Sequence, residues 1–126
     1  MPNRLVVLIV DDHPDLLITL SSFVERLPYV RVLSTGDFGR VATWIAAEKC
    51  IDLVLTNVWL KGDFNGLHVA DLAAAAHPEV AIVMISTDER SNIQGLPGHH
   101  AFIQMPFGVE ALIEHVDDAF VRRHKS

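Results

Sequence analysis

The stretch LVVLIVDDHP, residues 5–14, carries the clearest architectural signal, because an unbroken aliphatic run leads into two carboxylates and a proline. A run of this kind is typical of a parallel strand that is buried on both faces of a sheet. Pro14 suits the first turn of a helix, where its missing N–H leaves no hydrogen bond unmade. The stretch therefore predicts a buried strand at residues 5–10, acidic residues at its carboxyl end and a helix from Pro14.

Short apolar runs and amphipathic stretches alternate along the rest of the chain. Further strands are predicted at residues 29–33, 53–56, 81–86 and 101–104. Helices are predicted between Pro14 and Pro28, after Asp37, at residues 67–76 beyond a polar loop at 61–66, and from Val109. Gly95, Pro97 and Gly98 leave room for only a short helix between the last two strands. This alternation predicts an α/β fold with parallel strands, right-handed crossovers and helices on both faces of the sheet.

The composition favours one domain, residues 1–126, because half of the residues are apolar and can form a core. Cys50 is the single cysteine, so no internal disulfide is possible and a reducing cytoplasm is expected. No signal peptide and no membrane-spanning run is recognised. The formal net charge of -6 argues against nucleic acid as a direct partner. The basic residues Arg122, Arg123 and Lys125 are interpreted as complementing the negative end of the last helix.

In an open parallel sheet, the functional crevice lies at the carboxyl ends of the strands. The segments that reach this edge are LIVDDHP (residues 8–14), DLVLTNVWLKGDFNG (52–66), AIVMIST (81–87) and AFIQMPF (101–107). In this order and at this spacing, they resemble the receiver domains of two-component response regulators over essentially the whole chain. The resemblance implies a flavodoxin-like, doubly wound sheet of five parallel strands in the order 2-1-3-4-5. It also implies a role in phosphorelay signal transduction rather than an enzyme activity.

The resemblance assigns roles to five positions. Asp11 and Asp12 match the acidic pair that binds magnesium in the family, and Ser86 matches a hydroxyl that contacts the phosphoryl group. Phe102 matches the aromatic switch position on the fifth strand. Pro106 matches a proline that follows a lysine through a cis peptide bond. The rule for open parallel sheets predicts that Asp11, Asp12, Asn57, Ser86 and Met105 gather at the carboxyl edge.

Two positions depart from the family pattern. Asn57 stands where the family has the aspartate that accepts the phosphoryl group, and Met105 stands where it has the lysine. An amide oxygen is a far weaker nucleophile than a carboxylate oxygen, and a thioether carries no positive charge. The sequence therefore predicts a degenerate receiver that works without phosphorylation, as a module that binds other signalling proteins.

Several interpretations stay open at this point. The alternative function is an ordinary phosphoaccepting receiver in the form of an Asp→Asn variant at position 57. A flavin- or nucleotide-binding domain is disfavoured, because the chain after the first strand lacks the phosphate cradle that such a domain needs. Asp11 favours a weak residual Mg²⁺ site, with no cofactor required, and Asp12 fits either a metal ligand or a helix cap. Ser86 is expected to make a local hydrogen bond and Phe102 to be partly buried. The seven histidines are interpreted as surface residues. Expected partners are a sensor kinase, another regulator or an enzyme domain. A membrane is not expected as a partner, and the sequence does not predict the oligomeric state.

Overall fold

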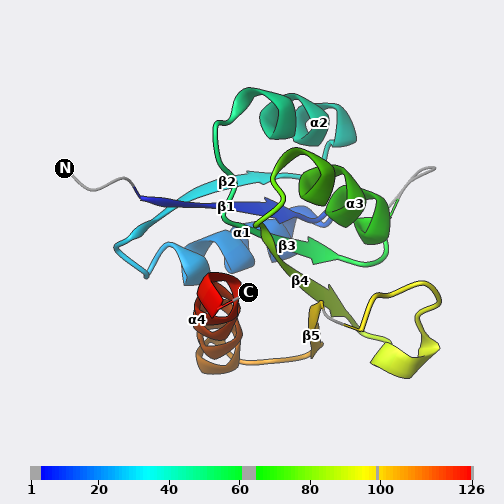
Figure 1. Cartoon of the computed structure of the whole chain (residues 1–126). Helices are drawn as coiled ribbons and strands as arrows, with labels where there is room; N and C mark the ends of the chain where they lie inside the picture. The colour runs from blue at the N-terminus through cyan, green and yellow to red at the C-terminus, as the bar shows by residue number, and fades with distance from the viewer. Residues whose placement is uncertain (1–3, 61–64, 99, 126) are drawn as a thin grey trace.

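A parallel five-stranded sheet with helices on both faces forms the protein (Figure 1). The computed structural model describes residues 4–60, 65–98 and 100–125, with side chains as far as Arg122. The strands lie in the order β2-β1-β3-β4-β5, as the resemblance implied. In chain order, the elements are β1 (Leu5–Val10), α1 (Pro14–Val24), β2 (Val30–Thr35), α2 (Phe38–Ala47), β3 (Leu53–Asn57), α3 (Gly66–Ala76), β4 (Ala81–Ser86), η1 (Arg90–Asn92), β5 (Ala101–Gln104) and α4 (Val109–Lys125).

Most predicted boundaries agree with the structure, and the largest difference is at the end of α1. This helix ends at Val24, before the predicted limit at Pro28, because the backbone then tightens into two short-range hydrogen bonds. The N–H of Arg26 donates to the Phe23 carbonyl at 3.3 Å, and that of Leu27 donates to the Val24 carbonyl at 3.0 Å. Residues 61–64 of the predicted polar loop, His99, and the side chains of Arg123 and Lys125 lie outside the described part.

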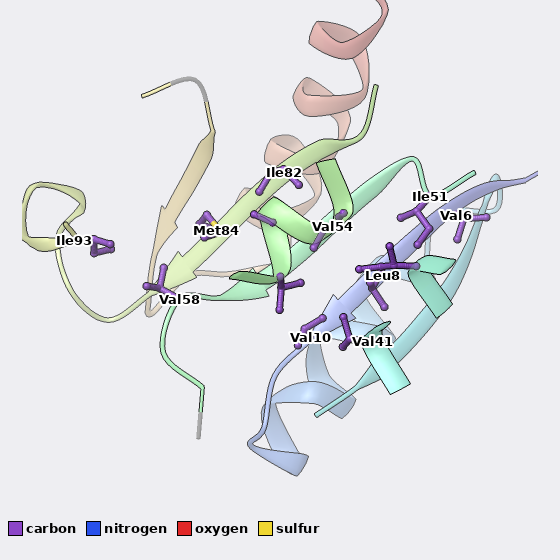
Figure 2. Packing of buried hydrophobic residues seen from close by; sticks show 14 residues of the cluster. Val6, Leu8, Val10, Val41, Ile51, Val54, Val58, Ile82, Met84 and Ile93 are labelled. Carbon is purple, nitrogen blue, oxygen red and sulfur yellow. The ribbon is translucent and has the colours of Figure 1, made fainter. Parts of the chain in front are cut away.

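The core has two layers, one on each face of the sheet. Helices α2 and α3 cover one face, and helices α1 and α4 cover the other (Figure 1). Side chains alternate along β1, so that Val6, Leu8 and Val10 pack under α2 and α3 (Figure 2), while Val7 and Ile9 pack under α1 and α4. This double burial explains why the first strand reads as a continuous aliphatic run. In the part that the structure describes, no helix is both long and apolar enough to cross a bilayer.

The connection between β4 and β5 is a short 3₁₀ turn, as the glycines and the proline of this segment predicted. The Arg90 guanidinium fixes it by donating hydrogen bonds to the carbonyl oxygens of Pro97 at 2.9 Å and Gly98 at 3.1 Å. The same guanidinium lies 6.0 Å from the centre of the Phe102 ring on β5. Ile93 of this connection is buried in the core layer under α2 and α3 (Figure 2), and Leu96 packs partly buried against the same layer.

The interpretation of all histidines as surface residues is wrong for His77. Its side chain is buried at the end of α3 and joins two other segments. Nδ1 accepts a hydrogen bond from the N–H of Ile51 at 3.3 Å, and Nε2 lies 2.9 Å from the carbonyl oxygen of Ile45. His77 therefore links the end of α3 to α2 and to the residues that enter β3.

Candidate functional site

Four of the predicted site residues meet at the carboxyl edge of the sheet. Asp11 follows β1, Asn57 ends β3, Ser86 ends β4, and Met105 follows β5. Asp11, Asn57 and Ser86 are all buried, and Asp11 and Ser86 are fully so. The Nδ2 amide group of Asn57 donates a hydrogen bond to Oδ2 of Asp11 at 3.2 Å, which joins the ends of two neighbouring strands. The topology therefore brings these positions together as the sequence predicted.

The Asp11 carboxylate accepts hydrogen bonds on both of its oxygens. Besides the bond from Asn57, its Oδ1 accepts from the backbone N–H of His13 at 2.8 Å. The Nδ1 atom of His13 lies 3.1 Å from the same oxygen and 3.2 Å from Oδ1 of Asp12. These donors explain how a buried carboxylate is accommodated, since a buried charge is costly without hydrogen bonds.

Asp12 does not act as the helix cap that one interpretation proposed. The N-cap residue of α1 is His13, and no side-chain hydrogen bond caps this helix. Asp11, Asp12 and His13 instead form a group in which one ligand atom from each lies within 4.8 Å of the others, a spacing that could hold a metal ion. The sequence analysis did not include His13 in this group, although its position directly after the acidic pair is a visible signal.

The orientation of Asn57 is set by two hydrogen bonds. Its Oδ1 accepts from the backbone N–H of Trp59 at 3.1 Å, so its NH₂ group faces Asp11. The backbone at Asn57 lies against the start of α3, where a Cβ atom on Gly66 would be only 2.3 Å from the Asn57 carbonyl oxygen. The N–H of Gly66 donates to the carbonyl oxygen of Val58 at 2.8 Å. Gly66 therefore permits a backbone-to-backbone contact that holds the end of β3.

One local hydrogen bond closes the loop after β4, and two more tie it to neighbouring segments. Ser86 Oγ accepts from the N–H of Asp88 at 3.0 Å, the local bond that the sequence analysis expected. Trp59 Nε1 donates to Asp88 Oδ2 at 2.7 Å, and Gln104 Nε2 donates to the Thr87 carbonyl oxygen at 3.3 Å. The sequence analysis did not find Trp59 and Asp88, because only the fold brings these distant loops together.

Met105 and Phe102 lie on opposite faces of the sheet. Phe102 is partly buried against the core layer under α2 and α3, in agreement with its expected partial burial. Met105 packs against the other layer, and its N–H donates to the Ser86 carbonyl oxygen at 2.7 Å. The Met105–Pro106 peptide bond is cis. The apolar Met105 side chain contributes no positive charge to the edge that carries Asp11 and Asp12.

Comparisons with known proteins agree with this geometry. A nitrogen assimilation regulatory protein, NtrX of Azorhizobium caulinodans, is 33% identical over 113 residues, which cover 85% of this chain and 24% of the relative. The chain thus spans about a quarter of the length of that curated relative. A response regulator receiver protein from Sinorhizobium medicae superposes with a TM-score of 0.84 at 21% identity, covering 95% of this chain and 97% of the other.

A second solved structure has the same fold. A CheY-like response regulator receiver domain protein from Methanospirillum hungatei superposes with a TM-score of 0.82 at 22% identity, covering 97% of this chain and 98% of the other. The family model of the response regulator receiver domain matches residues 7–117. This chain therefore belongs to the response regulator receiver domain family of two-component signalling.

Proposed function

We propose that this receiver domain works without phosphorylation, as a non-enzymatic module that binds other signalling proteins in one constitutive state. The observation that carries the proposal is the amide of Asn57 at the end of β3, with its NH₂ group toward Asp11 and its oxygen on the Trp59 N–H. Formation of an aspartyl phosphate requires a carboxylate oxygen that attacks phosphorus. Asn57 offers none, and its amide oxygen is already hydrogen-bonded.

The charge of the site supports a coordinated loss of two groups. An Asp→Asn change alone would leave a lysine at position 105 with one carboxylate fewer beside it. Two unit charges about 4 Å apart interact by roughly 4 kcal/mol at an effective dielectric constant near 20. Because position 105 is Met and packs into the core layer under α1 and α4, the lost carboxylate is matched by a lost cation. This pairing supports a natural degenerate site over an engineered single change.

The partners that we propose are proteins of the same signalling systems: a sensor kinase, another regulator or an enzyme domain. The name of the Azorhizobium relative, a nitrogen assimilation regulatory protein, supports a regulatory setting. We propose that residues 1–126 act as one receiver domain in the cytoplasm, with no required cofactor. The net charge of -6 gives no support to direct binding of nucleic acid.

The alternative is an ordinary receiver whose acceptor has been changed to Asn57. To test both, the protein is incubated with Mg²⁺ and a small-molecule phosphodonor, and its intact mass is recorded beside Asn57→Asp and the double variant Asn57→Asp with Met105→Lys. We expect no added phosphoryl group on the unchanged protein. A phosphoryl group on the double variant would show that the rest of the site is chemically competent.

Phosphorylation of the unchanged protein would contradict the proposal. Peptide mapping would then distinguish Ser86, Thr87 and a histidine from an Asn57 that has deamidated. Efficient phosphorylation of Asn57→Asp with Met105 still in place would favour the alternative, because it would show that a single change separates this site from an active one.

A further inference from the structure

We propose that the chain satisfies its buried Asp11 carboxylate with its own N–H groups, with His13 and Asn57 placing donors where a receiver of this family would place a divalent cation. The proposal rests on the function proposed above, because it explains how the site can persist in one state without phosphoryl group or metal. In this proposal, His13 is a hydrogen-bond donor to the Asp11 carboxylate.

The two oxygens of Asp11 already accept N–H groups of the chain. Oδ1 accepts from the His13 backbone at 2.8 Å and lies 3.1 Å from His13 Nδ1, and Oδ2 accepts from Asn57 Nδ2 at 3.2 Å. A carboxylate only accepts hydrogen bonds, so the Nδ1 atom of His13 must carry a hydrogen to make this contact. The same Nδ1 atom lies 3.2 Å from Oδ1 of Asp12, within ion-pair distance, but its hydrogen bond goes to Asp11.

This arrangement does not fit Mg²⁺. The ion requires oxygen ligands in near-octahedral geometry, and it gives up bound water reluctantly. Asn57 instead presents its nitrogen to Asp11, while its oxygen accepts the Trp59 N–H at 3.1 Å. To offer that oxygen to an ion, the amide would have to turn over and lose both hydrogen bonds. His13 adds an N–H hydrogen at the carboxylate oxygens that an ion would need.

His13 is the residue that makes the proposal testable. Its side chain is 63% exposed, so its removal opens no core cavity, whereas Asp11 is fully buried. Replacing His13 by Ala therefore removes the side-chain donor to Asp11 and leaves the fold and the two carboxylates in place. The carboxylates would then lack one of their donors, and a cation could take that position.

The experiment compares thermal unfolding of the unchanged protein, His13→Ala and the control variant His115→Ala in millimolar MgCl₂ and in NaCl of equal ionic strength. His115 lies on α4, where its ring contacts the Ala111 carbonyl oxygen of its own helix. We expect the unchanged protein and His115→Ala to show the same Tm in both salts. We expect His13→Ala to have a lower Tm in NaCl and to recover part of it in MgCl₂, since a ligand of the native state raises Tm. In a direct Mg²⁺ titration, His13→Ala should bind at least tenfold more tightly than the unchanged protein.

Every other pattern overturns the inference. A Tm of the unchanged protein that rises in MgCl₂ as much as that of His13→Ala would show that His13 does not replace the ion. A weaker Mg²⁺ response in His13→Ala would make His13 a ligand, and no response in any variant would show that Asp11 does not need the His13 donor. The phosphodonor test is independent: a protein that binds Mg²⁺ but takes no phosphoryl group overturns only this inference, and a phosphorylated protein overturns the proposed function.

Discussion

Replacing Gly66 by Ala should disturb the end of β3 through steric contact alone. A Cβ atom at this position would lie 2.3 Å from the Asn57 carbonyl oxygen and 3.0 Å from the Val58 Cα. Both neighbours are backbone atoms, so neither can move away by a side-chain rotation. Even weak C–H···O contacts keep carbon and oxygen about 3.3 Å apart, so the start of α3 would have to retreat by about 1 Å.

The expected loss of stability follows from two effects. Overpacking in a well-packed region destabilises by about 1–3 kcal/mol, and contact with rigid backbone places Gly66→Ala at the upper end. The retreat would also stretch the 2.8 Å hydrogen bond from Gly66 N–H to the Val58 carbonyl oxygen. That bond contributes about 1 kcal/mol net, which gives a total near 3–4 kcal/mol. With an m value of about 2 kcal/mol per molar urea, the unfolding midpoint should fall by roughly 1.5–2 M.

The assay is urea unfolding followed by circular dichroism, with Gly39→Ala as the matched control. Gly39 also lies in the first turn of a helix, but a Cβ atom there would meet only the Asp37 carboxylate, at 3.6 Å. Alanine favours the helix by up to about 1 kcal/mol over glycine, so the control should be neutral or more stable. A Gly66→Ala midpoint within about 0.3 M of the unchanged protein would refute the steric argument.

Two further predictions concern single side chains. Burial, the hydrogen bond to Asp117 and the charge of Asp117 raise the pKa of Tyr29 to about 12. The native state therefore holds this proton more tightly than the unfolded chain does. The contribution of Tyr29 to stability should be complete below about pH 10 and be lost as the pH rises toward about 12. Urea unfolding across that pH range should show that the free energy of unfolding falls less steeply with pH in Tyr29→Phe than in the unchanged protein. An equal fall in both proteins would contradict the role of Tyr29. His77→Ala should lower the free energy of unfolding by about 1–3 kcal/mol, because the buried Ile51 N–H loses its acceptor. A loss below about 0.5 kcal/mol in the same urea assay would contradict this prediction.

The sequence predicted the sheet and the meeting of Asp11, Asn57 and Ser86 because strand-end positions follow from topology. It did not predict which way the Asn57 amide points, since that depends on hydrogen bonds to Asp11 and to Trp59 N–H. The burial of His77 was also missed, because it arises from the packing of α3 against α2 and not from any local pattern. The early end of α1 has a similar cause: Leu27 keeps helical spacing and packs on the core, although the backbone has already left the helix.

The short connection between β4 and β5 has a consequence for local stability. Each α-helix that covers the sheet contributes two or more buried residues, whereas Ile93 is the one buried residue among those of this connection that the structure describes, with Leu96 partly buried beside the core. The hydrogen bonds from Arg90 to Pro97 and Gly98 depend on one partly exposed side chain. Segments with few buried apolar contacts open at a lower free energy than the strands beside them. Amide hydrogens of residues 90–98 should therefore exchange with solvent long before those of β1 and β3. Local unfolding of this connection should leave the hydrogen bonds in the rest of the sheet intact.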